Sequence, residues 1–145
     1  LTVYVCGVDT SEGKIEGELV GGNLEAVSNL AGTKFMPDYK DKIFFWEELE
    51  EDSSEISRIL MNYRLAGVFD KIKGMVIGKL FKCSPYMKLE VNKIIRETLK
   101  EYNFPIIYSV DFGHFCENIT LPIGIKAKID TKHKSFEFLE AAVTE

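Results

Sequence analysis

Three apolar segments of strand length constrain the fold of this chain more than any other feature. They are Lys42–Trp46, Gly74–Leu80 and Pro105–Val110, and in each of them apolar residues follow one another instead of alternating with polar ones. A strand of this composition is suited to burial on both faces, which is typical of parallel sheets. The three segments therefore predict the centre of a small parallel sheet.

An amphipathic helical pattern lies between each pair of these segments. The first begins at Asp52, which forms a capping-box pattern with Glu55, and it ends at Gly67. The second lies near Lys88–Tyr102. The positions on the two buried stripes are Ile56, Ile59, Leu60 and Tyr63 in the first helix, and Val91, Ile94, Ile95, Thr98, Leu99 and Tyr102 in the second. Alternation of strand and helix predicts an α/β fold with right-handed crossovers.

The N-terminal part is expected to add strands of a different kind. Leu1–Val5 is β-rich, Gly7–Gly13 is polar and turn-like, and Lys14–Val20 has the length of a short strand. Gly21-Gly22 would end that strand, and Asn23 is a good N-cap for a helix that Gly32 would stop. We therefore expect an antiparallel strand at this end of the sheet.

The C-terminal part predicts a half-exposed antiparallel hairpin. Ile125, Ala127 and Ile129 alternate with lysines, and the turn Asp130–Lys134 leads into Ser135–Leu139. With no internal repeat or long linker, the 145 residues are expected to form one domain.

Charge and cysteine content restrict the partners and the compartment. The formal net charge is −5, and the lysines are interleaved with acids, so neither nucleic acid nor an anionic membrane is an expected partner. Cys6, Cys83 and Cys116 are too few and too scattered for a disulfide framework, which favours a reducing, cytoplasmic location. No apolar stretch has the length of a membrane span, and no secretion signal is present.

The candidate catalytic residues follow two of the predicted parallel strands. Functional groups in open α/β sheets gather just past the carboxyl ends of the strands. Glu47 follows the first apolar segment, and His114 lies in the loop after the third, next to Gly113. If these strands lie side by side, Glu47 would orient the imidazole and stabilise its protonated form. Gly113 would permit a close backbone approach or an unusual dihedral angle.

Other arrangements of reactive residues are less convincing. Cys116 lies only two residues from His114, and neighbours in an extended loop rarely face each other, as a thiol and its base must. A zinc site built from these two residues, Cys83 and His133 lacks paired ligand spacing, so no metal or cofactor is expected. His133 lies in a lysine-rich turn and should face solvent, and the acidic run Glu47–Asp52 should be mostly solvated beyond its first member.

Five separated motifs follow one another along the chain. They are Gly17–Leu24, which ends in Gly-Gly-Asn-Leu; Ala31–Asp38; Ile43–Glu48; Arg64–Gly78; and Asp111–His114 with Asn118–Gly124. In this order they resemble the motifs of the LD-carboxypeptidase family of serine peptidases, which includes muramoyltetrapeptide carboxypeptidases and microcin C self-immunity proteins. The similarity runs from about Glu16 to Asp130.

This resemblance implies a Ser-His-Glu triad in which His114 is the general base and Glu47 orients it. It also implies a three-layer β/β/α swivelling-type domain, with a small parallel sheet plus antiparallel strands. In the family the serine and the oxyanion hole belong to a separate N-terminal domain, and no segment of this chain resembles that domain. The chain, which begins at Leu1, is therefore expected to be the C-terminal half of a two-domain peptidase, and to be inactive alone.

The resemblance further implies hydrolysis of an amide bond next to a free carboxyl terminus. We favour an LD-peptide bond in a peptidoglycan-derived tetrapeptide over an aminoacyl-nucleotide antibiotic, because the acids after Glu47 suit a phosphate-like group poorly. A non-catalytic binding module on the same domain is the remaining alternative. The expected partners are the small substrate, the N-terminal domain and, through an exposed apolar patch, a second copy of the chain as a homodimer.

Overall fold

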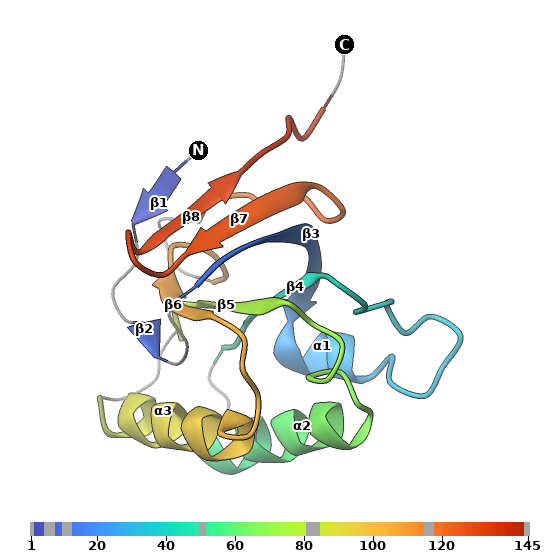
Figure 1. Cartoon of the computed structure of the whole chain (residues 1–145). Coiled ribbons are helices and arrows are strands. Elements are labelled where there is room, and N and C mark those ends of the chain that lie inside the picture. The colour runs from blue at the N-terminus through green and yellow to red at the C-terminus, as the bar shows by residue number, and fades with distance from the viewer. Residues whose placement is uncertain are drawn as a thin grey trace.

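The computed structural model describes residues 2–4, 8–9, 13–49, 52–80, 85–114 and 118–143. In this part of the chain, two layers of strands and one layer of helices are stacked on one another (Figure 1). The strands form a single eight-stranded sheet in the order β1-β8-β7-β3-β4-β5-β6-β2, and this sheet folds over on itself at β3. The predicted three-layer β/β/α architecture is confirmed. None of the described helices has the length and apolar character needed to span a membrane.

The elements follow one another in chain order. They are β1 (Thr2–Tyr4), β2 (Val8–Asp9), β3 (Lys14–Asn23), α1 (Leu24–Ser28), β4 (Ile43–Glu47), α2 (Ser53–Leu65), β5 (Gly74–Gly78), α3 (Pro85–Leu99), β6 (Ile106–Val110), β7 (Lys126–Asp130) and β8 (Ser135–Phe138).

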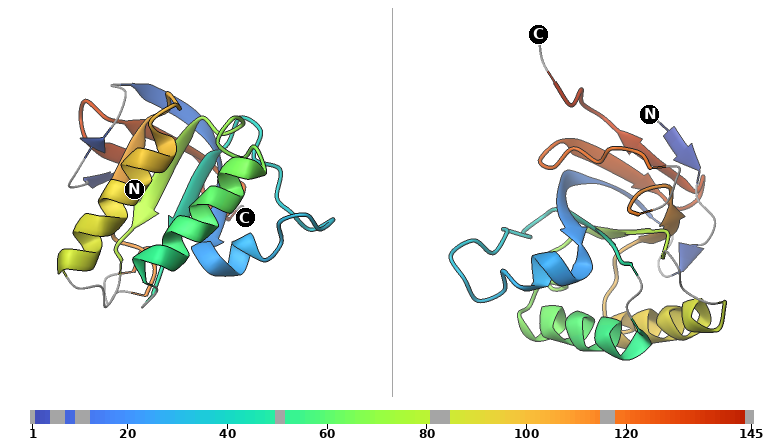
Figure 2. Two further views of the ribbon diagram at one scale, coloured as in Figure 1. Left: turned by 90° about the horizontal axis from the view of Figure 1, so that it is seen from below. Right: turned by 180° about the vertical axis from the view of Figure 1, so that it is seen from behind.

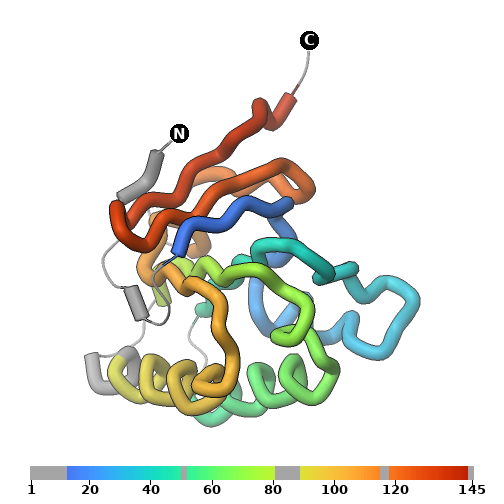
Figure 3. Tube along the Cα trace, viewed as in Figure 1, coloured from blue at the N-terminus to red at the C-terminus, as the bar shows by residue number. Residues whose placement is uncertain are grey.

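The middle layer is the predicted parallel sheet. The three predicted strands are β4, β5 and β6, which pair in parallel. Strand β3 was expected to be antiparallel, but its second half also pairs in parallel with β4, and β2 adds an antiparallel edge next to β6. Helices α2 and α3, which connect β4 to β5 and β5 to β6, lie side by side on the same face of this sheet (Figure 2). The connection from α1 to β4 instead loops out from the body of the domain (cyan in Figure 3). The parallel centre therefore has its helices on one side only.

The other side of the parallel sheet is covered by the antiparallel strands, and this explains the uninterrupted apolar segments. Along β4, Phe44 and Trp46 belong to the core beneath the helices, whereas Ile43 and Phe45 belong to a second core beneath β7 and β8. Successive side chains of a strand point to opposite faces, so each central strand must be apolar at every position to fill both cores. All five residues of β4 are buried.

Strand β3 belongs to both sheet layers. Its first half, Lys14–Glu18, pairs antiparallel with β7, and its second half, Leu19–Asn23, pairs in parallel with β4. Gly21 allows the backbones of β3 and β4 to approach closely, because a Cβ atom at this position would lie 1.7 Å from the carbonyl oxygen of Phe45. Its φ of 151° is also one that side-chain-bearing residues rarely adopt.

Three expectations about local structure were wrong. Gly21-Gly22 does not end the strand, which continues to Asn23. The turn-like segment Gly7–Gly13 contains β2, a two-residue strand that depends on pairing with β6 and so leaves no local pattern. Helix α1 ends at Ser28, well before the predicted stop at Gly32. The hairpin of β7 and β8 and the strand at Thr2–Tyr4 are confirmed, whereas Leu1 and Val5 lie outside the described residues.

Replacing Gly21 should test how tightly β3 is held against β4. We expect Gly21→Ala to lower the free energy of unfolding by about 3 kcal/mol or more, because the new methyl group collides with backbone and the φ angle is strained. Gly13→Ala is the matched control, since a Cβ at that position meets nothing within 4 Å. Urea unfolding measures the free energy of unfolding of the two variants. Equal stability of the two variants would contradict this account of the β3–β4 contact.

The cap of α2 should make the stability depend on pH. Hydrogen bonds from the Ser54 hydroxyl and the Glu55 backbone N–H lower the pKa of Asp52 below its ordinary 3.8. The ionised cap therefore stabilises the fold fully above pH 3.8. This stabilisation is lost as the pH falls through the folded-state pKa of Asp52. Asn caps helices about as well without titrating, so Asp52→Asn should be nearly neutral at pH 7 and should lose less stability in acid. Thermal unfolding of the variant and the wild type between pH 7 and pH values below 3.8 tests this prediction. The same loss of stability in acid for both proteins would refute it.

Candidate active site

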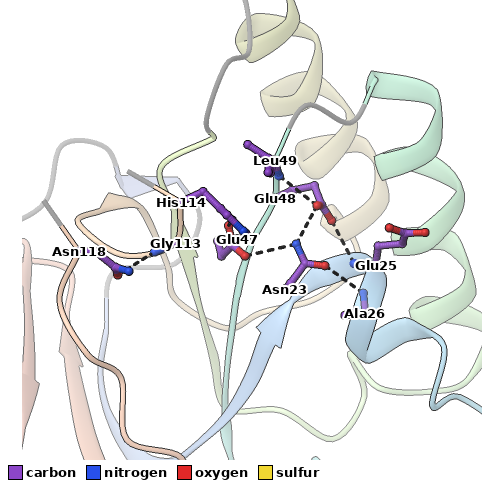
Figure 4. A network of polar contacts seen from close by, with 9 residues as sticks. All are labelled: Asn23, Glu25, Ala26, Glu47, Glu48, Leu49, Gly113, His114 and Asn118. Atoms are coloured by element: carbon purple, nitrogen blue, oxygen red, sulfur yellow. Dashed lines mark hydrogen bonds and ion pairs between the residues drawn. The ribbon is translucent and has the colours of Figure 1, made fainter. Parts of the chain in front are cut away.

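The candidate site lies at the carboxyl edge of the parallel sheet. Asn23 and Glu47 are the last residues of β3 and β4, and the parallel register pairs them directly. The loop after β6 brings Gly113 and His114 to the same edge (Figure 4). Glu47 thus ends the strand itself, whereas the sequence placed it just beyond. Its position explains why a carboxylate at the end of an apolar strand is buried.

Glu47 and His114 are hydrogen-bonded to each other. The Nδ1 atom of the imidazole lies 2.8 Å from Oε2 of the carboxylate. A carboxylate only accepts hydrogen bonds, so it keeps the proton on Nδ1 and leaves Nε2 free to accept one. The Glu47 side chain is 8% exposed and that of His114 is 47% exposed. The pair therefore combines a buried acid with a ring that a reactant can reach.

Two glycines make room for this contact. A Cβ atom at Gly113 would lie 2.7 Å from Oε2 of Glu47. A Cβ atom at Gly78, on β5, would lie 2.9 Å from the Cβ of Glu47. Gly113 also has a φ of 107°, which confirms the close approach and the unusual dihedral angle predicted for this residue. Its backbone N–H donates to the Asn118 side chain over 3.1 Å, next to His114 in the chain.

A second buried acid, Glu48, was missed by the sequence analysis. It is 3% exposed, so the expectation that the acids after Glu47 are solvated was wrong for this residue. Its carboxylate accepts three hydrogen bonds, from Asn23 Nδ2 at 2.8 Å, Leu49 N at 3.0 Å and Glu25 N at 3.0 Å. Asn23 Nδ2 also lies 3.2 Å from Oε1 of Glu47. The amide of Asn23 therefore bridges the two neighbouring carboxylates.

The structure also places other charged and candidate residues. Asp111 forms an ion pair with Lys79. His133 is 69% exposed, as predicted, and its Nδ1 contacts Asp130 at 2.9 Å. Cys83 and Cys116 lie outside the described residues. Within the described ranges, His, Cys, Asp and Glu side chains form no group of three or more that could hold a metal ion.

The hydrogen bonds of Glu47 predict what its amide analogue would do. In Glu47→Gln, the Asn23 amide would still donate to Oε1, so the new NH₂ group would face His114 and donate to Nδ1. We expect the ring proton to move from Nδ1 to Nε2, whereas Glu25→Gln, which removes an exposed charge nearby, should leave it in place. Ring ¹⁵N shifts distinguish the two tautomers. A proton that stays on Nδ1 in Glu47→Gln would show that the two side chains are not partners in solution.

Comparisons with known proteins agree on the type of domain. The model of the LD-carboxypeptidase C-terminal domain matches residues 16–129. The probable murein peptide carboxypeptidase of Bacillus subtilis is 33% identical over 137 residues, which are 92% of this chain and 42% of that protein. The microcin C7 self-immunity protein MccF of Escherichia coli is 31% identical over 131 residues, or 88% of this chain and 38% of its own length.

Solved structures show the same likeness. MccF in complex with aspartyl sulfamoyl adenosine superposes with a TM-score of 0.84 at 28% identity, over 96% of this chain and 42% of that one. The muramoyltetrapeptide carboxypeptidase from Oxalobacter formigenes superposes with a TM-score of 0.81 at 29% identity, over 95% of this chain and 48% of that one. The chain thus spans less than half the length of each of these relatives. It belongs to the LD-carboxypeptidase family, whose C-terminal domain it forms.

Proposed function

We propose that this domain supplies the general base and its orienting acid to a serine carboxypeptidase that hydrolyses an amide bond next to a free carboxyl terminus. The 2.8 Å contact between Glu47 Oε2 and His114 Nδ1 carries the proposal. A buried carboxylate on one ring nitrogen, with the rest of the ring accessible, is the arrangement that a serine-type triad requires.

The roles follow from the two ring nitrogens. His114 Nε2 would take the proton of a serine hydroxyl as the oxygen attacks the scissile carbonyl, and would then donate it to the leaving amine. Glu47 would stabilise the imidazolium formed between these steps without taking the proton itself. Water would release the acyl group from the serine by the same sequence.

We assign the serine and the oxyanion hole to an N-terminal domain outside these 145 residues. The lengths of the relatives support this assignment, because the chain covers only 42% of the probable murein peptide carboxypeptidase and 48% of the solved muramoyltetrapeptide carboxypeptidase. A base and an acid without a nucleophile or oxyanion donors supply little catalysis. The 145-residue chain alone should therefore be inactive.

The favoured substrate is the LD-peptide bond before the terminal D-alanine of a peptidoglycan-derived tetrapeptide, cleaved in the bacterial cytoplasm during wall recycling. Support comes from the murein-directed names of two relatives and from the local charge. All residues of Glu47–Asp52 except Leu49 are acidic, and such a segment repels a phosphate-like group. Scattered cysteines fit the reducing compartment.

An aminoacyl-nucleotide substrate is the second candidate. The observation in its favour is the TM-score of 0.84 to MccF in complex with aspartyl sulfamoyl adenosine. The same base and acid would serve there, since the bond cleaved is again an amide. The two candidates differ in the group that the intact enzyme must accommodate, so direct comparison of the two substrates separates them.

Removing the base in the intact protein tests the function. We expect His114→Ala to lower kcat/KM for an LD-tetrapeptide by roughly 10³-fold or more, because the serine loses its proton acceptor. His133→Ala is the matched control, since that histidine is exposed and its ring contacts Asp130. Release of D-alanine is the measurement.

Two outcomes would contradict the proposal. Normal turnover by a folded His114→Ala protein would remove the histidine from the mechanism. Failure of the wild-type intact protein to cleave the tetrapeptide, together with hydrolysis of an aminoacyl sulfamoyl nucleoside, would replace the favoured substrate with the second candidate.

A further inference from the structure

Glu48 is surrounded by hydrogen-bond donors. Its Oε1 accepts from the side chain of Asn23 and the backbone N–H of Leu49, and its Oε2 accepts from the backbone N–H of Glu25 (Figure 4). These three donors come from the end of β3, the first turn of α1 and the chain directly after β4. A side chain that is 3% exposed is thus held at three points, and all three require an acceptor.

Asn23 can adopt only one orientation between these groups. Its Oδ1 accepts from the backbone N–H of Ala26 at 3.0 Å, so its NH₂ group must face the two carboxylates. One hydrogen bond goes to Glu48 at 2.8 Å and the other to Oε1 of Glu47 at 3.2 Å. Every polar atom of the amide is therefore used.

We propose that Glu48 is a positioning residue for the Glu47–His114 pair and that it acts through Asn23. Glu48 holds the amide, the amide occupies Oε1 of Glu47, and only Oε2 is left to receive the imidazole. The carboxylate plane of Glu47 is thereby fixed, and with it the ring nitrogen that carries the proton. The catalytic meaning of this arrangement rests on the proposed function, but the effect on His114 does not.

A purely structural role for Glu48 makes a different prediction. Asn23 already caps α1, so Glu48 would then add only a further bond to the first turn of a five-residue helix. Its loss would lower the stability of the domain and leave the imidazole unchanged. The position of the proton on the His114 ring therefore separates the two roles, because a merely structural contact would not move it.

The test is the tautomer of His114 in Glu48→Ala, read from ring ¹⁵N shifts of the 145-residue chain. Ala removes both carboxylate oxygens, so the Asn23 amide loses the acceptor that holds it. We expect the Nδ1–H form to fall by roughly half as Glu47 becomes free to rotate. Glu25→Gln is the matched control, because it removes an exposed charge in the first turn of α1 and keeps the backbone N–H that donates to Glu48.

A second variant tests the same link independently. Asn23→Ser retains a hydroxyl that can cap α1 but removes the amide that bridges the two carboxylates. We expect the same loss of the Nδ1–H form. If Glu48→Ala does not fold, as judged by circular dichroism, Asn23→Ser decides the question.

Folded variants with a wild-type tautomer would overturn the proposal, and so would an equal change in Glu25→Gln, because the effect would then be one of charge. These outcomes do not depend on hydrolysis. If the intact protein cleaves no tetrapeptide but the tautomer responds to Glu48→Ala, the proposed function fails and the positioning role stands. If the intact protein is active, Glu48→Ala should lower its kcat with little change in KM.

Discussion

The parallel pairing of β3 with β4 is the contact on which both the architecture and the candidate site depend. It joins the antiparallel layer to the parallel layer, because the first half of β3 pairs with β7 and the second half with β4. It also places Asn23 opposite Glu47 at the edge where His114 arrives. Gly21 permits the pairing by leaving space for the Phe45 carbonyl. One backbone contact therefore determines the layers and the geometry of the acid.

Two adjacent buried carboxylates would normally be costly, and their surroundings explain how this fold retains them. Burial of an ionised group is unfavourable unless hydrogen bonds replace the lost water. Glu48 receives two of its three hydrogen bonds from backbone N–H groups, and Glu47 receives the amide of Asn23 and the ring of His114. A single amide serves both acids. The site is thus built from a few donors that cannot be replaced one at a time.

The sequence predicted the features that repeat along the chain and missed those made by tertiary contact. Uninterrupted apolar segments showed the parallel strands, since burial on both faces demands them. The positions of Glu47 and His114 followed from a rule about strand ends, which depends on the fold class and not on side-chain detail. Their roles in catalysis remain a prediction. Glu48 could not be recognised, because its three donors come from separate elements and an acidic run is usually solvated. The two-residue β2 and the continuation of β3 through two glycines likewise depend on their partner strands.

The shared strand also has a consequence for how the domain can open. In a structure of separate layers, an outer sheet can detach by local unfolding while the rest stays native. Here the antiparallel layer cannot be pulled away without straining the ten residues of β3, whose last member holds the Glu47 carboxylate. We therefore expect loosening of the β7–β8 hairpin to disturb the contact between Glu47 and His114. On this view the outer layer and the acid–imidazole pair open together as one cooperative unit.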